Sequence, residues 1–188
     1  MRVWWLSAGL ALYCLAQSAA AGTLLVVGDS ISAGFGLDSR QGWGSLLQAR
    51  LRGEGFDDKV VNASISGDTS AGGQARLPAL LAAHKPSLVV LELGGNDGLR
   101  GQSPAQLQQN LASMIEHSRQ AGAKVLLLGM RLPPNYGVRY TTAFAKVYEQ
   151  LAADKQVPLV PFFLEGVGGV PELMQADGIH PAQGAQQR

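Results

Sequence analysis

The chain has little of several features that define common protein classes, and each shortage excludes something. Its 188 residues contain one cysteine, Cys14, so no internal disulfide can form, and no cysteine nucleophile exists in residues 22–188. Only 15% of the residues are charged, with 15 basic side chains against 14 acidic ones. This balance offers no attraction to nucleic acid or to an anionic membrane surface. The apolar runs are shorter than the ~20 residues that a membrane-spanning helix needs.

The first 21 residues have the pattern of a secretory signal peptide. A basic residue is followed by an apolar stretch and then by small residues, which favours cleavage near Ala20 or Ala21. Cys14 as a lipoprotein acceptor is the less favoured alternative, because the large Tyr13 stands before it where a small residue is expected. We therefore predict a signal peptide over residues 1–21 and a periplasmic or secreted protein.

Residues 22–188 alternate between short apolar runs and segments with helical spacing, and 46% hydrophobic content is enough for one domain with a real core. Continuous apolar runs are typical of parallel strands covered on both faces. Five runs predict strands at 23–28, 58–64, 87–93, 123–130 and 157–163. Apolar spacing and end signals predict helices at 43–55, 103–122 and 137–156. The alternation predicts an α/β fold, a three-layer αβα sandwich around a five-stranded parallel sheet of the flavodoxin-like type.

Residues that could take part in catalysis follow the carboxyl ends of these predicted strands, where binding and catalytic groups of such sheets collect. Ser30 is the last residue of the Gly-Asp-Ser motif at the end of the first strand. Gly67 lies in the loop after the second strand, and Asn96 lies in the Gly-Gly-Asn-Asp motif after the third. Asp177 and His180 come after the last strand. We expect the fold to bring all five to one rim of the sheet.

These residue types match the needs of acyl transfer. Ser30 can be the nucleophile and His180 its base, since an imidazole titrates near neutral pH. Asp177 lies three residues before His180, so one tight turn can bring its carboxylate to Nδ1. The backbone N–H groups of Ser30 and Gly67 and the side-chain amide of Asn96 can stabilise an oxyanion. Gly67 lets its loop approach closely, because glycine has no Cβ.

The motifs, in this order, resemble those of the SGNH, or GDSL-like, hydrolases. The closer resemblance is to a secreted bacterial group of multifunctional thioesterases, lysophospholipases and arylesterases, through NASISGDTS, ELGGNDGLRG, RLPPNYG and DGIHP. It covers nearly all of residues 23–181 and implies an αβα sandwich without metal or cofactor. The resemblance also implies roles for five residues: a catalytic Ser30, Asp177 and His180, and an oxyanion hole of Ser30, Gly67 and Asn96.

We therefore predict a serine hydrolase that cleaves acyl esters and thioesters through an acyl-enzyme. Candidate substrates are lysophospholipids, aryl esters and acyl-CoA-like thioesters. Leu99 and Leu132 are the predicted contacts to the acyl chain. Asp29 is interpreted as a turn stabiliser, Glu92 as the site of a structural hydrogen bond, and Phe162 as a core residue. We expect a monomer with a small-molecule or lipid acyl substrate, without nucleic acid and without stable membrane insertion.

Three alternatives stay open. A carbohydrate O-deacetylase would use the same fold and the same chemistry. A metal-dependent phosphoesterase is suggested by loop residues that include Asp29, Asp68 and Asp97, although such a site needs several imidazole ligands and only one histidine lies in these loops. A nucleotide-binding module is suggested by the sheet, but the first loop has neither Gly-x-Gly-x-x-Gly nor a phosphate-loop lysine.

The chain departs from the pattern of the family at its C-terminal end. Related chains continue past the histidine into a final helix, whereas only eight residues follow His180 here. Globular helices average about 11 to 12 residues, so these eight can hold at most a stub. The final helix normally covers one sheet face and anchors the loop with Asp177 and His180. We therefore expect a truncated C-terminal helix in domain 22–188, with lower stability and activity.

Overall fold

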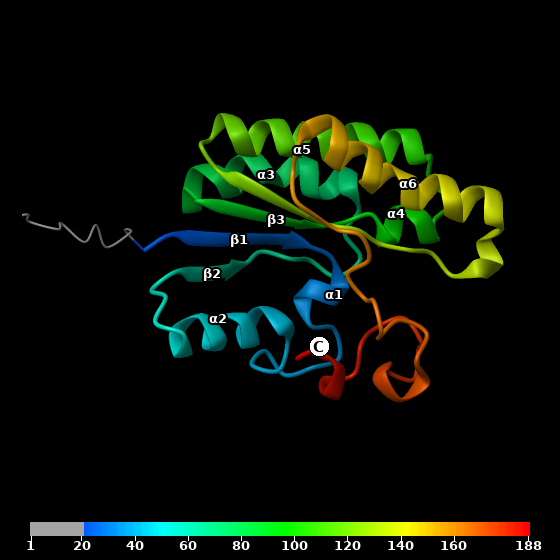
Figure 1. Cartoon of the computed structure of the whole chain (residues 1–188), viewed down its shortest axis with the longest axis horizontal. Helices are drawn as coiled ribbons and strands as arrows, with labels where there is room; N and C mark the ends of the chain where they lie inside the picture. Colours follow the sequence, from blue (N-terminus) through cyan, green and yellow to red (C-terminus); the bar gives the residue numbers. More distant parts are fainter. Residues whose placement is uncertain (1–20) are drawn as a thin grey trace, which may run out of the picture.

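The computed structural model describes residues 21–188. The predicted signal peptide up to residue 20, with Cys14, lies outside the described residues. Five parallel strands form one sheet in the order β2-β1-β3-β4-β5, which is the flavodoxin-like order (Figure 1). The sheet confirms the predicted fold class. Its strands are β1 (Thr23–Gly28), β2 (Lys59–Asn62), β3 (Leu88–Glu92), β4 (Lys124–Leu128) and β5 (Leu159–Val160).

Helices cover both faces of this sheet and complete the three layers. Figure 1 shows α3, α5 and α6 on one side, and α1, α2 and the C-terminal turn on the other. Among residues 21–188, no helix is both long enough and apolar enough to cross a bilayer. The helices are α1 (Ser30–Ala33), α2 (Trp43–Gly53), α3 (Ser70–His84), α4 (Gly95–Leu99), α5 (Pro104–Gln120) and α6 (Val138–Lys155), with 3-10 turns at Pro134–Tyr136, Pro171–Leu173 and Gln183–Ala185.

Local sequence signals explain where most elements start and stop. α5 begins with Pro104 directly after an extended Ser103, as expected for a residue that lacks an N–H and has a helical φ. The chain leaves this helix through Gly122, whose φ is +84°. β5 is much shorter than the predicted 157–163, because Pro158 and Pro161 flank it and proline cannot donate to a sheet ladder.

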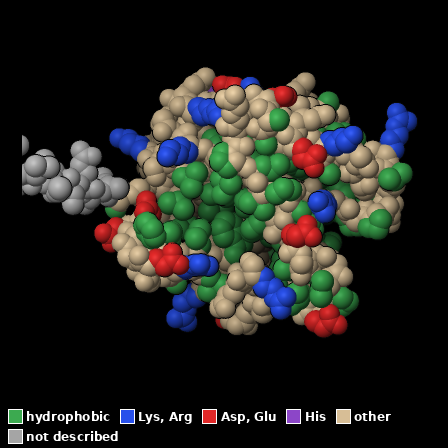
Figure 2. Space-filling model, viewed as in Figure 1, with side chains coloured by type: hydrophobic (Ala, Val, Ile, Leu, Met, Phe, Trp, Pro, Cys, Tyr) green, Lys and Arg blue, Asp and Glu red, His purple; other side chains and the backbone are tan. Residues whose placement is uncertain are grey.

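The two faces of the sheet bury very different amounts of apolar surface. Alternate residues of β1 point to opposite faces, and Leu25 and Val27 join the large core beneath α3, α5 and α6. The α2 face has a small cluster of three buried residues that includes Val26, with Trp43 packed against it. Figure 2 shows apolar side chains gathered between α2 and the sheet, beside a cavity of about 500 Å³ that Trp43 lines.

β1 and β3 lie side by side at the centre of the sheet, with Gly28 in register with Glu92. Their connections leave in opposite directions, since β2 lies on one side of β1 and β4 lies beyond β3. Such a switch in strand order opens a crevice at the carboxyl ends of the two strands. The segments that carry Ser30 and Asn96 begin at this point.

Candidate active site

The loop after β1 places Ser30 at the start of a short helix. Asp29 caps α1, and its Oδ1 accepts a hydrogen bond from the Ile31 N–H at 3.0 Å. As the first residue of α1, Ser30 has a backbone N–H that no intrahelical carbonyl accepts. Gly28 is required before the turn, because a Cβ there would lie 2.7 Å from Glu92 Oε2.

A hairpin near the C-terminus carries Asp177 and His180. The backbone N–H of Gln175 donates to the His180 carbonyl at 2.7 Å, which closes the hairpin. Asp177 Oδ1 accepts from the N–H groups of Ile179 and His180, at 2.9 and 3.0 Å. These two hydrogen bonds fold the Asp-Gly-Ile-His segment into a tight turn, with the carboxylate beside the imidazole.

Ser30, His180 and Asp177 form a continuous chain of hydrogen bonds. His180 Nε2 lies 2.8 Å from Ser30 Oγ, across 150 residues of sequence, and His180 Nδ1 lies 2.6 Å from Asp177 Oδ2. Hydrogen bonds from His180 and Ile179 lower the pKa of Asp177 to about 2. An ionised Asp177 accepts a hydrogen bond from Nδ1–H of His180, so that Nε2 is left to accept the proton of the Ser30 hydroxyl.

Of the three residues predicted to form the oxyanion hole, two line the same cavity and the third does not. Ser30 and Asn96 both line the same cavity, and Asn96 Nδ2 donates one N–H to Asp29 Oδ2 at 3.1 Å. Gly67 is not among the residues that line this cavity. Its loop is tied by Arg100, whose Nη2 donates to the Gly67 carbonyl at 2.9 Å.

The structure also changes the reason for a glycine at position 67. We predicted a close approach of the loop, but an added Cβ would meet nothing nearer than Arg100 Nη2 at 3.9 Å. The φ of Gly67 is +80°, a conformation that costs a residue with a Cβ about 1–2 kcal/mol. Within the protein, the glycine is therefore explained by its backbone conformation, and the close approach of its loop to a substrate stays a prediction.

An apolar cavity of about 510 Å³ opens beside Ser30. Leu99 and Leu132, the predicted acyl contacts, both line it. Phe162 lines it too, so our assignment of this residue to the core is wrong. Further apolar lining comes from Met130, Pro133, Pro134, Leu164, Met174 and Ile179.

Phe35 is a neighbour of the site that the sequence analysis missed. Its ring lies 4.4 Å from the imidazole of His180, centroid to centroid, with 32° between the two planes. Gln175 holds the Phe35 segment, since its Nε2 donates to the Phe35 carbonyl at 2.7 Å. The sequence signal that could have indicated this contact is a large aromatic residue only five places after Ser30. In the structure, this residue lies just beyond the four-residue helix α1.

Two buried carboxyl groups lie directly beneath the nucleophile. Glu92 is fully buried, and its Oε2 accepts from Ser32 Oγ at 2.6 Å and from the Asp29 N–H at 3.4 Å. The predicted structural hydrogen bond of Glu92 is thereby observed. Burial, together with the charge of Asp29, holds the pKa of Glu92 well above its ordinary value. Burial also raises the pKa of Asp29, to about 6.

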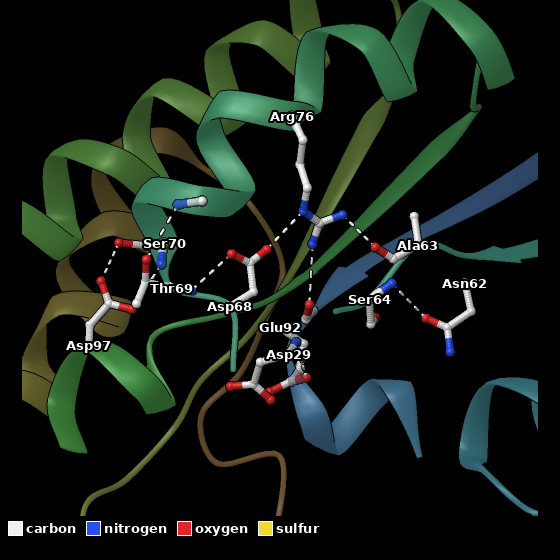
Figure 3. A network of polar contacts seen from close by, with 12 residues as sticks. Asp29, Asn62, Ala63, Ser64, Asp68, Thr69, Ser70, Arg76, Glu92 and Asp97 are labelled. Atoms are coloured by element: carbon white, nitrogen blue, oxygen red, sulfur yellow. Dashed lines mark hydrogen bonds and ion pairs between the residues drawn. The ribbon is translucent and has the colours of Figure 1, made fainter. Parts of the chain in front are cut away.

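Arg76 ties the loops around these carboxyl groups together. Figure 3 shows its guanidinium between Asp68 and the loop at Ala63, above Asp29 and Glu92. Nε bonds Asp68 Oδ2 at 2.8 Å, Nη2 donates to the Gly28 carbonyl at 3.3 Å, and Nη1 donates to the Ala63 carbonyl. The carboxyl ends of β1 and β2 and the start of α3 are thus fixed by one side chain.

The polar loop residues do not form an evident metal centre. Within residues 21–188, no three or more His, Cys, Asp or Glu side chains are grouped so that they could hold a metal ion. Asp97 instead accepts from the Ser70 N–H at 2.8 Å, and Asp68 pairs with Arg76. These carboxylates hold loops in place.

The family follows from the comparison with known proteins. The profile of the GDSL-like lipase/acylhydrolase family matches residues 26–188. The chain belongs to this family. Membership in this family makes the protein an acylhydrolase, as the motifs around Ser30 and His180 predicted.

Individual relatives agree with this assignment. The chain is 70% identical to esterase TesA of Pseudomonas aeruginosa, over 100% of this chain and 94% of that protein. It is 51% identical to thioesterase 1/protease 1/lysophospholipase L1 of Escherichia coli, over 90% of this chain and 80% of that protein. The crystal structure of the psychrotrophic esterase EstA from Pseudoalteromonas, inhibited by monoethylphosphonate, superimposes with a TM-score of 0.85 at 42% identity, over 88% of this chain and 91% of that one.

Proposed function

We propose that the protein is a serine esterase and thioesterase that transfers the acyl group of its substrate first to Ser30 and then to water. The observation that carries the proposal is the chain of hydrogen bonds from Ser30 Oγ through His180 to Asp177, at 2.8 and 2.6 Å. Ser30 and His180 both line the apolar cavity. A nucleophile, its base and an orienting carboxylate are the parts that acyl transfer needs.

The first half of the reaction forms the acyl-enzyme. His180 Nε2 takes the hydroxyl proton as Ser30 Oγ attacks the acyl carbon, and Asp177 stabilises the imidazolium that forms. The oxygen that becomes negative is met by the N–H of Ser30 and by the free N–H of the Asn96 amide, with the N–H of Gly67 as the third predicted donor. The intermediate collapses when His180 returns the proton to the leaving alcohol or thiol.

The second half releases the acid. A water molecule gives a proton to His180 Nε2 and attacks the acyl carbon of the ester on Ser30. The same donors stabilise the second oxyanion, and His180 then protonates Ser30 Oγ as the acyl bond breaks. The products are a carboxylic acid and the free enzyme, so the cycle consumes one water and needs no cofactor.

The substrate class follows from the cavity and from the relatives. Leu99, Leu132 and Phe162 line the cavity next to Ser30, which favours an acyl chain over a sugar ring. The names of the relatives include esterase, thioesterase and lysophospholipase. We therefore propose lysophospholipids, aryl esters and acyl-CoA-like thioesters as substrates, for a monomer that acts in the periplasm or outside the cell.

The proposal is tested by labelling and by hydrolysis. We expect a fluorophosphonate to label the purified protein at Ser30, and expect Ser30→Ala to lose both the label and the hydrolysis of p-nitrophenyl acyl esters and acyl-CoA. EDTA should leave both activities unchanged. Hydrolysis that survives Ser30→Ala would disprove the serine mechanism. A preference for acetylated sugars over acyl esters would instead assign the site to a deacetylase.

A further inference from the structure

The side-chain amide of Asn96 can donate to an oxyanion only if its nitrogen faces the reacting carbonyl. An asparagine side chain can rotate so that its oxygen and nitrogen exchange places. Here Asn96 Nδ2 donates to Asp29 Oδ2 at 3.1 Å. An ionised carboxylate only accepts hydrogen bonds, so this contact exists in one of the two orientations. Asp29 therefore determines which end of the Asn96 amide faces the cavity and leaves the second N–H free.

Asp29 is itself held firmly. It is 2% exposed, its Oδ1 accepts from the Ile31 N–H at 3.0 Å, and its own N–H donates to Glu92 Oε2 at 3.4 Å. Gly95 packs close on the other side, since a Cβ there would lie 3.2 Å from Asp29 Oδ2. One oxygen of the carboxylate is thus bonded to the helix that begins with Ser30, and the other to Asn96.

We propose that Asp29 is a positioning residue for the reaction, whose two carboxylate oxygens hold the start of α1 and the Asn96 amide in the relative geometry that oxyanion binding requires. The proposal rests on the proposed serine mechanism. It assigns Asp29 more than the turn stabilisation that the sequence indicated, because the bond to Asn96 joins the ends of β1 and β3. Asp29 does not touch the substrate in this role and acts through Asn96.

The role requires an ionised carboxylate. A protonated carboxyl group keeps one good acceptor oxygen, so either Ile31 or Asn96 would lose its partner. The groups that face Asp29 are Glu92 from β3, Asp68 from the loop before α3 and His180 from the C-terminal hairpin. Burial raises the pKa of Asp29 to about 6, while the amide of Asn96 and the charge of His180 oppose this rise. The positioning contact should therefore weaken as the pH falls below about 6.

A double-mutant cycle tests the proposal with kcat for a p-nitrophenyl acyl ester. Loss of one oxyanion donor in Asn96→Ala should lower kcat by about 10²- to 10³-fold. We expect Asp29→Ala to lower kcat by roughly 10- to 100-fold, part of that donor's effect, with little change in KM. In the Asn96→Ala background, Asp29→Ala should cost clearly less than in the wild type, because one of the two groups that it positions is already gone.

Equal losses in the two backgrounds would overturn the proposal, and so would full activity of Asp29→Ala. Asp38→Asn, at an exposed loop carboxylate, is the matched control and should keep wild-type kcat. Ser30→Ala distinguishes a failure of the serine mechanism from a failure of the positioning role of Asp29. If Ser30→Ala stays active, the serine mechanism fails; if it is inactive while the cycle is additive, the positioning role of Asp29 alone fails.

Asp29→Asn provides a second measurement that does not depend on the alanine variant folding. The amide keeps the shape of the carboxyl group but offers one acceptor oxygen instead of two. We expect an intermediate loss of kcat and a less steep fall of kcat below pH 6, because the carboxyl group whose protonation weakens the contact to Asn96 has been removed. An acid limb identical in shape to that of the wild type would overturn the proposal.

Discussion

Asp29→Asn should also change how stability depends on pH, and the size of the effect follows from burial. The pKa of Asp29 is about 6 in the folded protein, against an ordinary value of 3.8. One pKa unit corresponds to 1.36 kcal/mol, so the gap amounts to ~3 kcal/mol. The side chain is 2% exposed, so solvent screening removes little of this.

The sign follows from the proton that the folded state retains. Because the pKa of Asp29 is raised by folding, its contribution to stability is fully present below pH 3.8. It is lost as the pH rises towards 6, where the folded protein must keep a charge away from water. Asparagine has no charge to bury. The free energy of unfolding of Asp29→Asn, minus that of the wild type, should therefore rise by roughly 2–3 kcal/mol between pH 4 and pH 7.5.

Urea unfolding followed by far-UV circular dichroism at several pH values measures this difference. Any hydrogen bond that the amide makes differently from the protonated carboxyl group changes the stability of the variant equally at every pH, so the slope with pH is diagnostic and the absolute stability is not. Asp38→Asn, at an exposed carboxylate, should give a flat difference. A flat difference for Asp29→Asn as well would show that burial does not raise the pKa of this group.

Three further predictions concern the site and its loops. Phe35→Ala removes the ring that lies 4.4 Å from the imidazole of His180; kcat should fall roughly 10-fold, which corresponds to about 1.4 kcal/mol of orientation, and an unchanged kcat would contradict this. Leu132→Ala widens the cavity, so kcat/KM across a series of p-nitrophenyl esters should shift towards longer acyl chains; the same optimum as the wild type would remove Leu132 from the acyl site. Gly67→Ala must adopt a φ of +80°, and thermal unfolding should show a loss of about 1–2 kcal/mol, whereas an unchanged midpoint would mean that the loop adapts.

Much of the site could be predicted because its local parts are visible in the sequence. The spacing of Asp177 and His180 specifies a turn, and the structure contains it, closed by hydrogen bonds to Asp177 Oδ1. The position of Ser30 after a buried strand is equally local. The catalytic roles of these residues stay predictions, although the structure brings Ser30, His180 and Asp177 into one chain of hydrogen bonds.

The residues that were misjudged share a physical cause. Phe162 lines the cavity and the ring of Phe35 lies against the imidazole of His180, yet an aromatic side chain in a core and one in a cavity leave the same pattern in a sequence. Asp29 was interpreted from one half of its contacts. Its bond to Ile31, two residues away, is a local pattern, whereas its bond to Asn96 spans 67 residues.

The sequence alone predicts the positions of the five strands, the helices α2, α5 and α6 and the tight turn at Asp177, because hydrophobic period, proline, glycine and short-range hydrogen bonds act within a few residues; it does not predict α3. The tertiary structure alone decided that β1 lies beside β3, that Ser30 meets His180, and that Asp29 orients Asn96. These contacts depend on the order of strands and on packing across the sheet, which bring together groups that no local interaction connects.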